Sequence, residues 1–169
     1  PQAFWTSALG YRVALLPADA PLQTMPGVAS ELEGDLRQGL VLMQPIDPAD
    51  AAGAPQLAGD PADYRIRFFA PGLGIDEDPV TGSAHALVAP YWLEQLGRSR
   101  VVGWQCSDRP GGMYCEAAFS GMIRLIGSGY LLWDGTLRTW HKPCDAPSDG
   151  RAPGETGAEA AGWALCRTG

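Results

Sequence analysis

Positive charge is scarce in this 169-residue chain, where 12 Lys and Arg residues stand against 19 Asp and Glu residues and the formal net charge is −7. Nucleic acids and anionic membranes bind proteins with a surplus of basic side chains, so neither is an expected partner. No apolar run approaches the ~18 residues of a membrane span, and no basic start precedes an apolar stretch. We therefore expect a cytoplasmic protein. Because the chain begins at Pro1 without an initiator Met, we also expect a fragment.

Cysteine is too sparse and too scattered for a disulfide scaffold or a zinc site. The four cysteines are Cys106, Cys115, Cys144 and Cys166, and none forms a C-x-x-C pair. Reduced thiols are therefore expected; a Cys106–Cys115 bridge across a hairpin is the alternative. His141 and Cys144 could offer two metal ligands, but nothing nearby completes a zinc set. We expect no metal and no organic cofactor.

The patterning predicts an α+β protein with closely spaced strands. Seven short segments read as strands, at residues 11–16, 39–43, 64–69, 101–106, 113–118, 122–127 and 130–133, and tight turns punctuate the last four. Within the third, Tyr64, Ile66 and Phe68 alternate with Arg65, Arg67 and Phe69 and so share one face. Apolar positions four residues apart predict a short helix over 26–37.

The main helix is predicted from about Gly82 to Leu96. Between Gly82 and Leu93 it has no formally charged residue, so it should be buried on nearly all sides. A curled, mostly antiparallel sheet wrapped around this central helix is the simplest architecture that buries it. Pro90 should kink or break the helix, and Gly97 is well placed to end it.

The end of the chain changes character. Residues 145–162 are dominated by Ala, Pro, Gly, Ser and charged residues without an apolar period. We therefore expect one domain over residues 1–138, followed by a disordered or foreign tail over 139–169.

The start of the main helix is the place where chemistry could occur. Gly82 lets the backbone approach a ligand closely, and Thr81 or Ser83 can cap the helix. The first N–H groups of a helix form a natural seat for a carboxylate. Asp78 lies just before that seat, where it could hold an amino or hydroxyl group or move a proton. From composition and spacing alone, an ordinary turn and cap is the more frequent explanation.

The other polar residues near this segment favour structural roles. Ser83 lacks the flanking glycines of a hydrolase G-x-S-x-G elbow, and His85 lies on another side of the helix. We expect His85 to be a satisfied helix residue rather than a base. Arg65 and Arg67 are expected at a solvated or loop-facing strand edge, with anion steering as the alternative, and Glu77 is expected on the surface.

A long ordered series of residues resembles the PhzF-like family of phenazine-biosynthesis isomerases. The series comprises R-F-F-A-P at 67–71, G-I at 74–75, E-D-P-V-T-G-S-A-H at 77–85, A-P-Y-W at 89–92, L-G at 96–97, and Q-C-S-D-R-P-G-G at 105–112. The resemblance is close over residues 64–137 and loose over residues 1–63. It implies one lobe, the second, of a two-lobed fold similar to that of diaminopimelate epimerase, with the active site between the lobes.

The resemblance also implies a function. It suggests the isomerisation of a small carboxylic acid by proton transfer, without metal or organic cofactor. Asp78 would be the catalytic residue that contacts the substrate, while Gly82 and Ser83 would bind its carboxylate. The expected partners are the substrate and the missing first lobe of the same protein. Loss of that lobe would expose an apolar face, which favours a homodimer.

Two departures from the family pattern qualify these expectations. Pro110 is inserted between Arg109 and the glycine pair, which alters the turn there. The family's principal acid/base, a Glu near a G-N-P-A motif in the first lobe, is missing. The chain alone is therefore expected to be inactive as an isomerase. The alternative is a non-catalytic module of the same fold that binds a small carboxylate or has a regulatory role.

Overall fold

The computed structural model describes residues 1–47 and 53–136. The chain divides into two units, Pro1–Tyr130 and Leu131–Gly169. The predicted boundary at residue 138 and the predicted disordered tail lie outside the described residues, as do His141, Cys144 and Cys166. All of the elements given below belong to the first unit.

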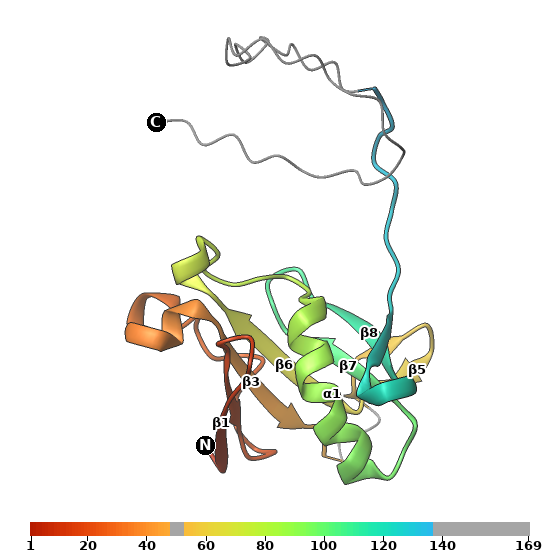
Figure 1. Cartoon of the computed structure of the whole chain (residues 1–169), viewed down its shortest axis with the longest axis horizontal. Coiled ribbons are helices and arrows are strands. Elements are labelled where there is room, and N and C mark those ends of the chain that lie inside the picture. Colours follow the sequence, from red (N-terminus) through yellow and green to blue (C-terminus); the bar gives the residue numbers. More distant parts are fainter. Residues whose placement is uncertain (48–52, 137–169) are drawn as a thin grey trace, which may run out of the picture. The chain divides into compact units, whose positions relative to one another are not determined.

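A seven-stranded sheet forms the centre of this unit (Figure 1). In sheet order its strands are β1 (Ala3–Thr6), β2 (Arg12–Leu15), β3 (Leu40–Pro45), β6 (Tyr64–Phe69), β7 (Arg100–Gln105), β8 (Gly111–Ala117) and β9 (Ile123–Ile126). Strand β2 pairs parallel with β3 and β6 pairs parallel with β7, while the other neighbours are antiparallel. The sheet is therefore mixed, and it stays open because β1 and β9 are its two edges.

The one α-helix among the described residues, α1 (Gly82–Leu96), packs on one face of this sheet (Figure 1). Its inward side carries six buried residues: Ala84, His85, Val88, Ala89, Trp92 and Leu93. Ser83, Pro90 and Glu94 are exposed, so the predicted burial on nearly all sides is wrong. The low charge of the helix had suggested that burial, but small and uncharged residues are tolerated on its open side. The α+β class is confirmed, whereas a sheet wrapped around the helix is not.

The helix begins and ends close to the predicted positions. It runs unbroken through Pro90, although a kink or break was expected there. Gly97 ends it in the left-handed conformation with φ 61°, and its N–H donates to the Glu94 and Leu93 carbonyls. Glycine adopts this conformation without steric cost, which explains the end of the helix. No helix in the described part of the chain is long and apolar enough to cross a membrane.

The two faces of the sheet bury two apolar clusters. Tyr64, Ile66 and Phe68 pack with α1, as their alternation predicted. Phe69 faces the other way, with Leu22 and Leu42, against irregular segments. Those segments include two 3-10 helices, η1 (Ala29–Glu31) and η2 (Gly34–Gln38), where one α-helix was expected.

The remaining elements are short. The 3-10 helices η4 (Pro71–Leu73) and η5 (Phe119–Gly121) follow β6 and β8. Strands β4 (Gln56–Leu57) and β5 (Asp60–Pro61) form a small hairpin in a stretch that reads as a loop in the sequence. The predicted strand over 130–133 does not form.

Candidate functional site

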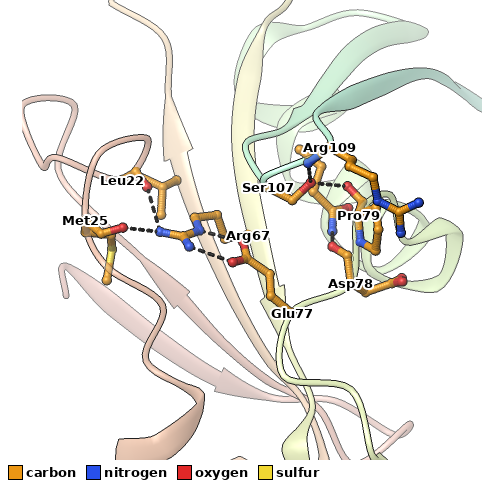
Figure 2. Close-up of polar contacts among 9 residues, drawn as sticks. Leu22, Met25, Arg67, Glu77, Asp78, Pro79, Ser107 and Arg109 are labelled. Carbon is orange, nitrogen blue, oxygen red and sulfur yellow. Dashed lines mark hydrogen bonds and ion pairs between the residues drawn. The ribbon is translucent and has the colours of Figure 1, made fainter.

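The segment before α1 is fastened to the sheet by backbone and side-chain hydrogen bonds. The Asp78 N–H donates to the Phe68 carbonyl at 3.0 Å. Ser107 Oγ donates to the Pro79 carbonyl at 2.9 Å and accepts from the Arg109 N–H at 3.3 Å (Figure 2). These bonds tie the predicted catalytic segment to β6 and to the turn that follows β7.

Gln105, at the end of β7, is the hub of this arrangement and is fully buried. Its Oε1 accepts from the Thr81 N–H at 2.8 Å. Its Nε2 donates to the Asp78 carbonyl at 2.5 Å and to Thr81 Oγ1 at 3.1 Å. The Gln105 amide thus binds both Asp78 and Thr81, the two ends of the segment 78–81 (the Asp78 turn). These bonds fix the Asp78 turn relative to the sheet.

The Asp78 carboxylate is held within the same turn. Thr81 Oγ1 donates to Asp78 Oδ2 at 2.5 Å. Thr81 is the residue that precedes α1, but its hydroxyl serves Asp78 and makes no capping bond to the helix. The expected cap by Thr81 or Ser83 is therefore wrong: α1 starts without a side-chain cap among the described residues. Its first N–H groups remain available to an external acceptor.

Gly82 and Ser83, the two predicted carboxylate-binding residues, form the first turn of α1. Ser83 is exposed, and its Oγ lies 3.4 Å from the Tyr11 hydroxyl. A Cβ on Gly82 would lie 3.4 Å from Leu125 Cδ1, which is nearly ordinary contact. The structure thus brings Asp78, Gly82 and Ser83 to one place, the start of α1. Their role in binding is not tested by this geometry and stays a prediction.

Glu77 and Asp78 are adjacent but turn in opposite directions (Figure 2). Glu77 forms a two-bond ion pair with Arg67, whose side chain is nearly buried; both contacts measure 2.6 Å. Arg67 also donates to the Met25 and Leu22 carbonyls at 2.5 and 3.5 Å. The expected exposure of Glu77 is therefore wrong. Of the two alternatives for Arg67, the loop-facing one holds and the solvated one does not. Irregular segments cover that face of the sheet and enclose the pair.

The inserted Pro110 lies at the end of the turn between β7 and β8. The pairing of Gln105 with Gly111 across the two strands is retained. A Cβ on Gly111 would lie 2.7 Å from Val80 Cγ2, so a larger residue there would require the exposed Val80 side chain to shift. The insertion is thus accommodated in the turn, and Gln105 keeps its place beneath the site.

His85 is fully buried one turn into α1. Its Nδ1 lies 3.0 Å from the Tyr64 hydroxyl, which lies 3.6 Å from Cys115 Sγ. Burial lowers the pKa of His85 to about 4, so its ring is neutral at pH 7. This agrees with a core residue rather than a base. Its Nε2, however, has no hydrogen-bond partner among the described residues. The expectation that both ring nitrogens are hydrogen-bonded is therefore only half met.

Metal binding has no support in the part of the chain described. No group of three or more His, Cys, Asp or Glu residues there could hold a metal ion. Cys106 and Cys115 are both free and buried. Cys115 lies opposite Val101 in the β7–β8 ladder, so the alternative bridge to Cys106 is not formed. Burial raises the pKa of both thiols to about 11, which keeps them protonated at pH 7.

A separate apolar cavity of about 240 Å³ lies between the first strands and α1. Its lining includes Trp5, Met43, Leu87 and Tyr91, and it does not include Asp78, Gly82 or Ser83. At the candidate site, Ser83 is exposed, whereas Asp78 and Gly82 are half-buried.

The described residues form an α+β structure with a mixed sheet and one α-helix, similar to solved PhzF proteins. A PhzC/PhzF protein from Clostridium difficile superposes with a TM-score of 0.61 at 26% identity, over 82% of this chain and 48% of that chain. A PhzF-family protein from Enterococcus faecalis gives a TM-score of 0.53 at 25% identity, over 76% of this chain and 46% of that chain.

Sequence comparison agrees. The family model described as phenazine biosynthesis-like protein matches residues 47–127. Mouse phenazine biosynthesis-like domain-containing protein 2 is 35% identical over 116 residues, which is 69% of this chain and 38% of that protein. An uncharacterized isomerase of Pseudomonas aeruginosa is 41% identical over 76 residues, 45% of this chain and 29% of that protein. The chain belongs to the PhzF-like family and spans less than half the length of these relatives.

Sequence reasoning found Asp78, Gly82 and Ser83 but missed the residues that hold them. Gln105 was noted only as part of a family motif, and Tyr11 only as the start of a strand. Gln105 lies 24 positions from Thr81, and Tyr11 lies 72 positions from Ser83. No local pattern signals such contacts. A polar residue at the end of an otherwise apolar strand was the one available sign for Gln105.

Proposed function

We propose that this chain is the ligand-binding second lobe of a PhzF-like isomerase or epimerase. Its ligand would be a small carboxylic acid held at the start of α1 by the Gly82 and Ser83 N–H groups and the Ser83 hydroxyl. Asp78 would contact the same ligand. The observation that carries the proposal is the uncapped start of α1 beside a fixed carboxylate, Asp78, which Thr81 and Gln105 hold in place.

The charges at this site favour a particular kind of ligand. The helix start attracts an anion, whereas Asp78 repels one. A ligand with a carboxylate at one end and an amino or hydroxyl group nearby satisfies both: its carboxylate accepts from the helix N–H groups, and its donor group faces Asp78. Simple carboxylates without that donor would bind less well. In this proposal Asp78 both contacts the ligand and discriminates against carboxylates that lack a nearby hydrogen-bond donor.

Proton transfer needs a second positioned group. An acid/base must come within hydrogen-bond reach of the proton that moves, roughly 2.6–3.2 Å between heavy atoms. His85 is buried and faces Tyr64, so it does not meet that need. We propose that the second group comes from a first lobe that closes over the start of α1, as the family resemblance implies. The reaction would require neither metal nor organic cofactor.

The test is a titration of the 169-residue chain with anthranilate, which carries an amino group beside its carboxylate. Benzoate lacks the amino group, and 2-aminobenzamide lacks the negative charge. Binding of anthranilate should be the tightest of the three, by NMR titration. Asp78→Asn should weaken anthranilate but not benzoate, while Ser83→Ala should weaken both.

Matched controls are the nearby exposed Asp76 and the exposed Ser99. Asp76→Asn and Ser99→Ala should bind anthranilate like the wild-type chain. Wild-type affinity in both Asp78→Asn and Ser83→Ala would overturn the proposed site. Selective binding without proton exchange, even with a first lobe present, would instead favour the non-catalytic carboxylate-binding module.

A further inference from the structure

Tyr11 reaches the start of α1 from the far end of the sequence. It lies in the turn between β1 and β2, outside the residues 47–127 that match the family model. Its hydroxyl is 3.4 Å from Ser83 Oγ, and either oxygen can be the donor. Tyr11 is half-buried, and its hydroxyl contact with Ser83 is exposed.

Packing of its ring and hydrogen bonds of its backbone hold Tyr11 in this position. Its ring packs against Phe68, with 4.9 Å between centroids and an interplanar angle of 51°. A Cβ on Gly39 would lie 2.4 Å from Tyr11 Cδ1, so the ring occupies space that only glycine leaves open. Its backbone is held by Ser7: the Tyr11 N–H donates to Ser7 Oγ at 3.0 Å, and the Ser7 N–H donates to the Tyr11 carbonyl at 2.8 Å.

Tyr11 is therefore fixed in position relative to both Asp78 and Ser83. Phe68, on which its ring packs, also accepts the hydrogen bond from the Asp78 N–H at 3.0 Å. Its hydroxyl meets Ser83 on the other side. A phenol held by a packed ring loses little conformational freedom when a ligand binds. A hydrogen bond from this phenol to the ligand therefore has a low entropic cost.

We infer that Tyr11 is a further ligand-contacting residue, whose phenol donates a hydrogen bond to the carboxylate bound at Ser83. This inference rests on the proposed function. In the free protein one of the two hydroxyls donates to the other across a long 3.4 Å contact. A carboxylate is an acceptor only, so both hydroxyls can rotate toward it and donate. They exchange one weak bond for two charge-assisted ones.

The experiment compares Tyr11→Phe with Tyr114→Phe in the full 169-residue chain. Tyr11→Phe keeps the packed ring and removes only the hydroxyl. Tyr114→Phe removes a hydroxyl that donates to the Leu57 carbonyl and Asp60, in the β4–β5 hairpin. The probes are anthranilate and its uncharged amide, 2-aminobenzamide. Tyr11→Phe should weaken anthranilate about tenfold, the usual effect of one hydrogen bond to a charged group. Binding of the amide should be unchanged, and Tyr114→Phe should bind both probes like wild type.

The outcomes separate this inference from the proposed function. If Ser83→Ala weakens anthranilate while Tyr11→Phe does not, the role of Tyr11 is overturned and the site stands. An equal loss of anthranilate and amide binding in Tyr11→Phe would show a structural role, which also overturns the inference. If the wild-type chain binds no anthranilate, the proposed function fails and Tyr11 has no ligand to contact.

Discussion

Arg67 and Glu77 form a buried two-bond ion pair directly beside Asp78, on the side of the sheet opposite α1 (Figure 2). The pair joins β6 to the segment that leads into the candidate site. Through its bonds to the Leu22 and Met25 carbonyls, Arg67 also joins that segment to the irregular layer beneath the sheet. The position of Asp78 thus depends on contacts made by its neighbour.

Replacing Glu77 should therefore cost stability. Glu77→Gln leaves the Arg67 guanidinium, 6% exposed, without its counter-charge. Removing one partner of a buried pair costs on the order of 3 kcal/mol, because the remaining charge stays desolvated. Chemical denaturation should show this loss. The control is Glu94→Gln on the exposed side of α1, which should change the free energy of unfolding by less than about 0.5 kcal/mol. Equal stability of the two variants would contradict the structural role of the pair.

Gln105 should matter for both stability and binding. Gln105→Leu is similar in size but loses three hydrogen bonds, to the Thr81 N–H, Thr81 Oγ1 and the Asp78 carbonyl. Leaving buried backbone groups unpaired should cost about 2–4 kcal/mol and loosen the Asp78 turn, so affinity for anthranilate should fall. The exposed Gln95 on α1 supplies the control. If Gln105→Leu bound anthranilate as tightly as Gln95→Leu, Gln105 would have no role in positioning the candidate site.

His85 predicts a loss of stability in acid. Its pKa is about 4 in the folded protein and near 6.5 when unfolded, so the unfolded state binds a proton first as pH falls. Above pH 6.5 the ring is neutral in both states, and the free energy of unfolding keeps its full value. As pH falls from 6.5 to about 4, protonation of His85 in the unfolded state progressively lowers the free energy of unfolding. The loss can reach about 3 kcal/mol.

Other groups titrate in the same range, so the decisive quantity is a difference. His85→Asn removes the titration and keeps a polar atom near Tyr64. Unfolding free energies of both proteins should be measured from pH 7 to pH 4. The wild type should lose more stability than the variant over this interval. Parallel curves would show that the ring already takes up its proton in the folded state.

The sequence predicted secondary structure better than it predicted which residues are buried by segments distant along the chain. Residues 64–69 form a strand with the expected faces because alternation follows directly from strand geometry. The same alternation put Arg67 on the opposite face, at a solvated or loop-facing edge. Its burial depends on irregular segments that have no periodic signal. Likewise, residues 26–37 have helical spacing, but Leu32 is extended and Gly34 adopts φ 53°, which separates two 3-10 turns.

The candidate site shows the same division. A turn entering an apolar helix was visible at Asp78 to Ser83, and so was its chemistry. The supports from Gln105 and Tyr11 depend on how β6 pairs with β7 and where the β1–β2 turn falls. Parallel pairing across a long connection leaves no local trace in the sequence. The family series pointed to Gln105, but only the fold shows what its amide binds.

The last prediction is that this chain alone exchanges no substrate proton at an appreciable rate. Asp78 is half-buried, its neighbour Glu77 is held in the ion pair with Arg67, and His85 is buried against Tyr64. A site that lacks its first lobe also loses positioning, and water screens each electrostatic contact. The measurement is deuterium incorporation from solvent into a PhzF-type substrate, for the chain alone and for the chain mixed with a first lobe that carries the family Glu. We expect exchange only in the mixture, and none when Asp78→Asn replaces the wild-type chain. Exchange by the chain alone, at the rate of a full-length relative, would place the acid/base within these 169 residues and contradict the two-lobe proposal.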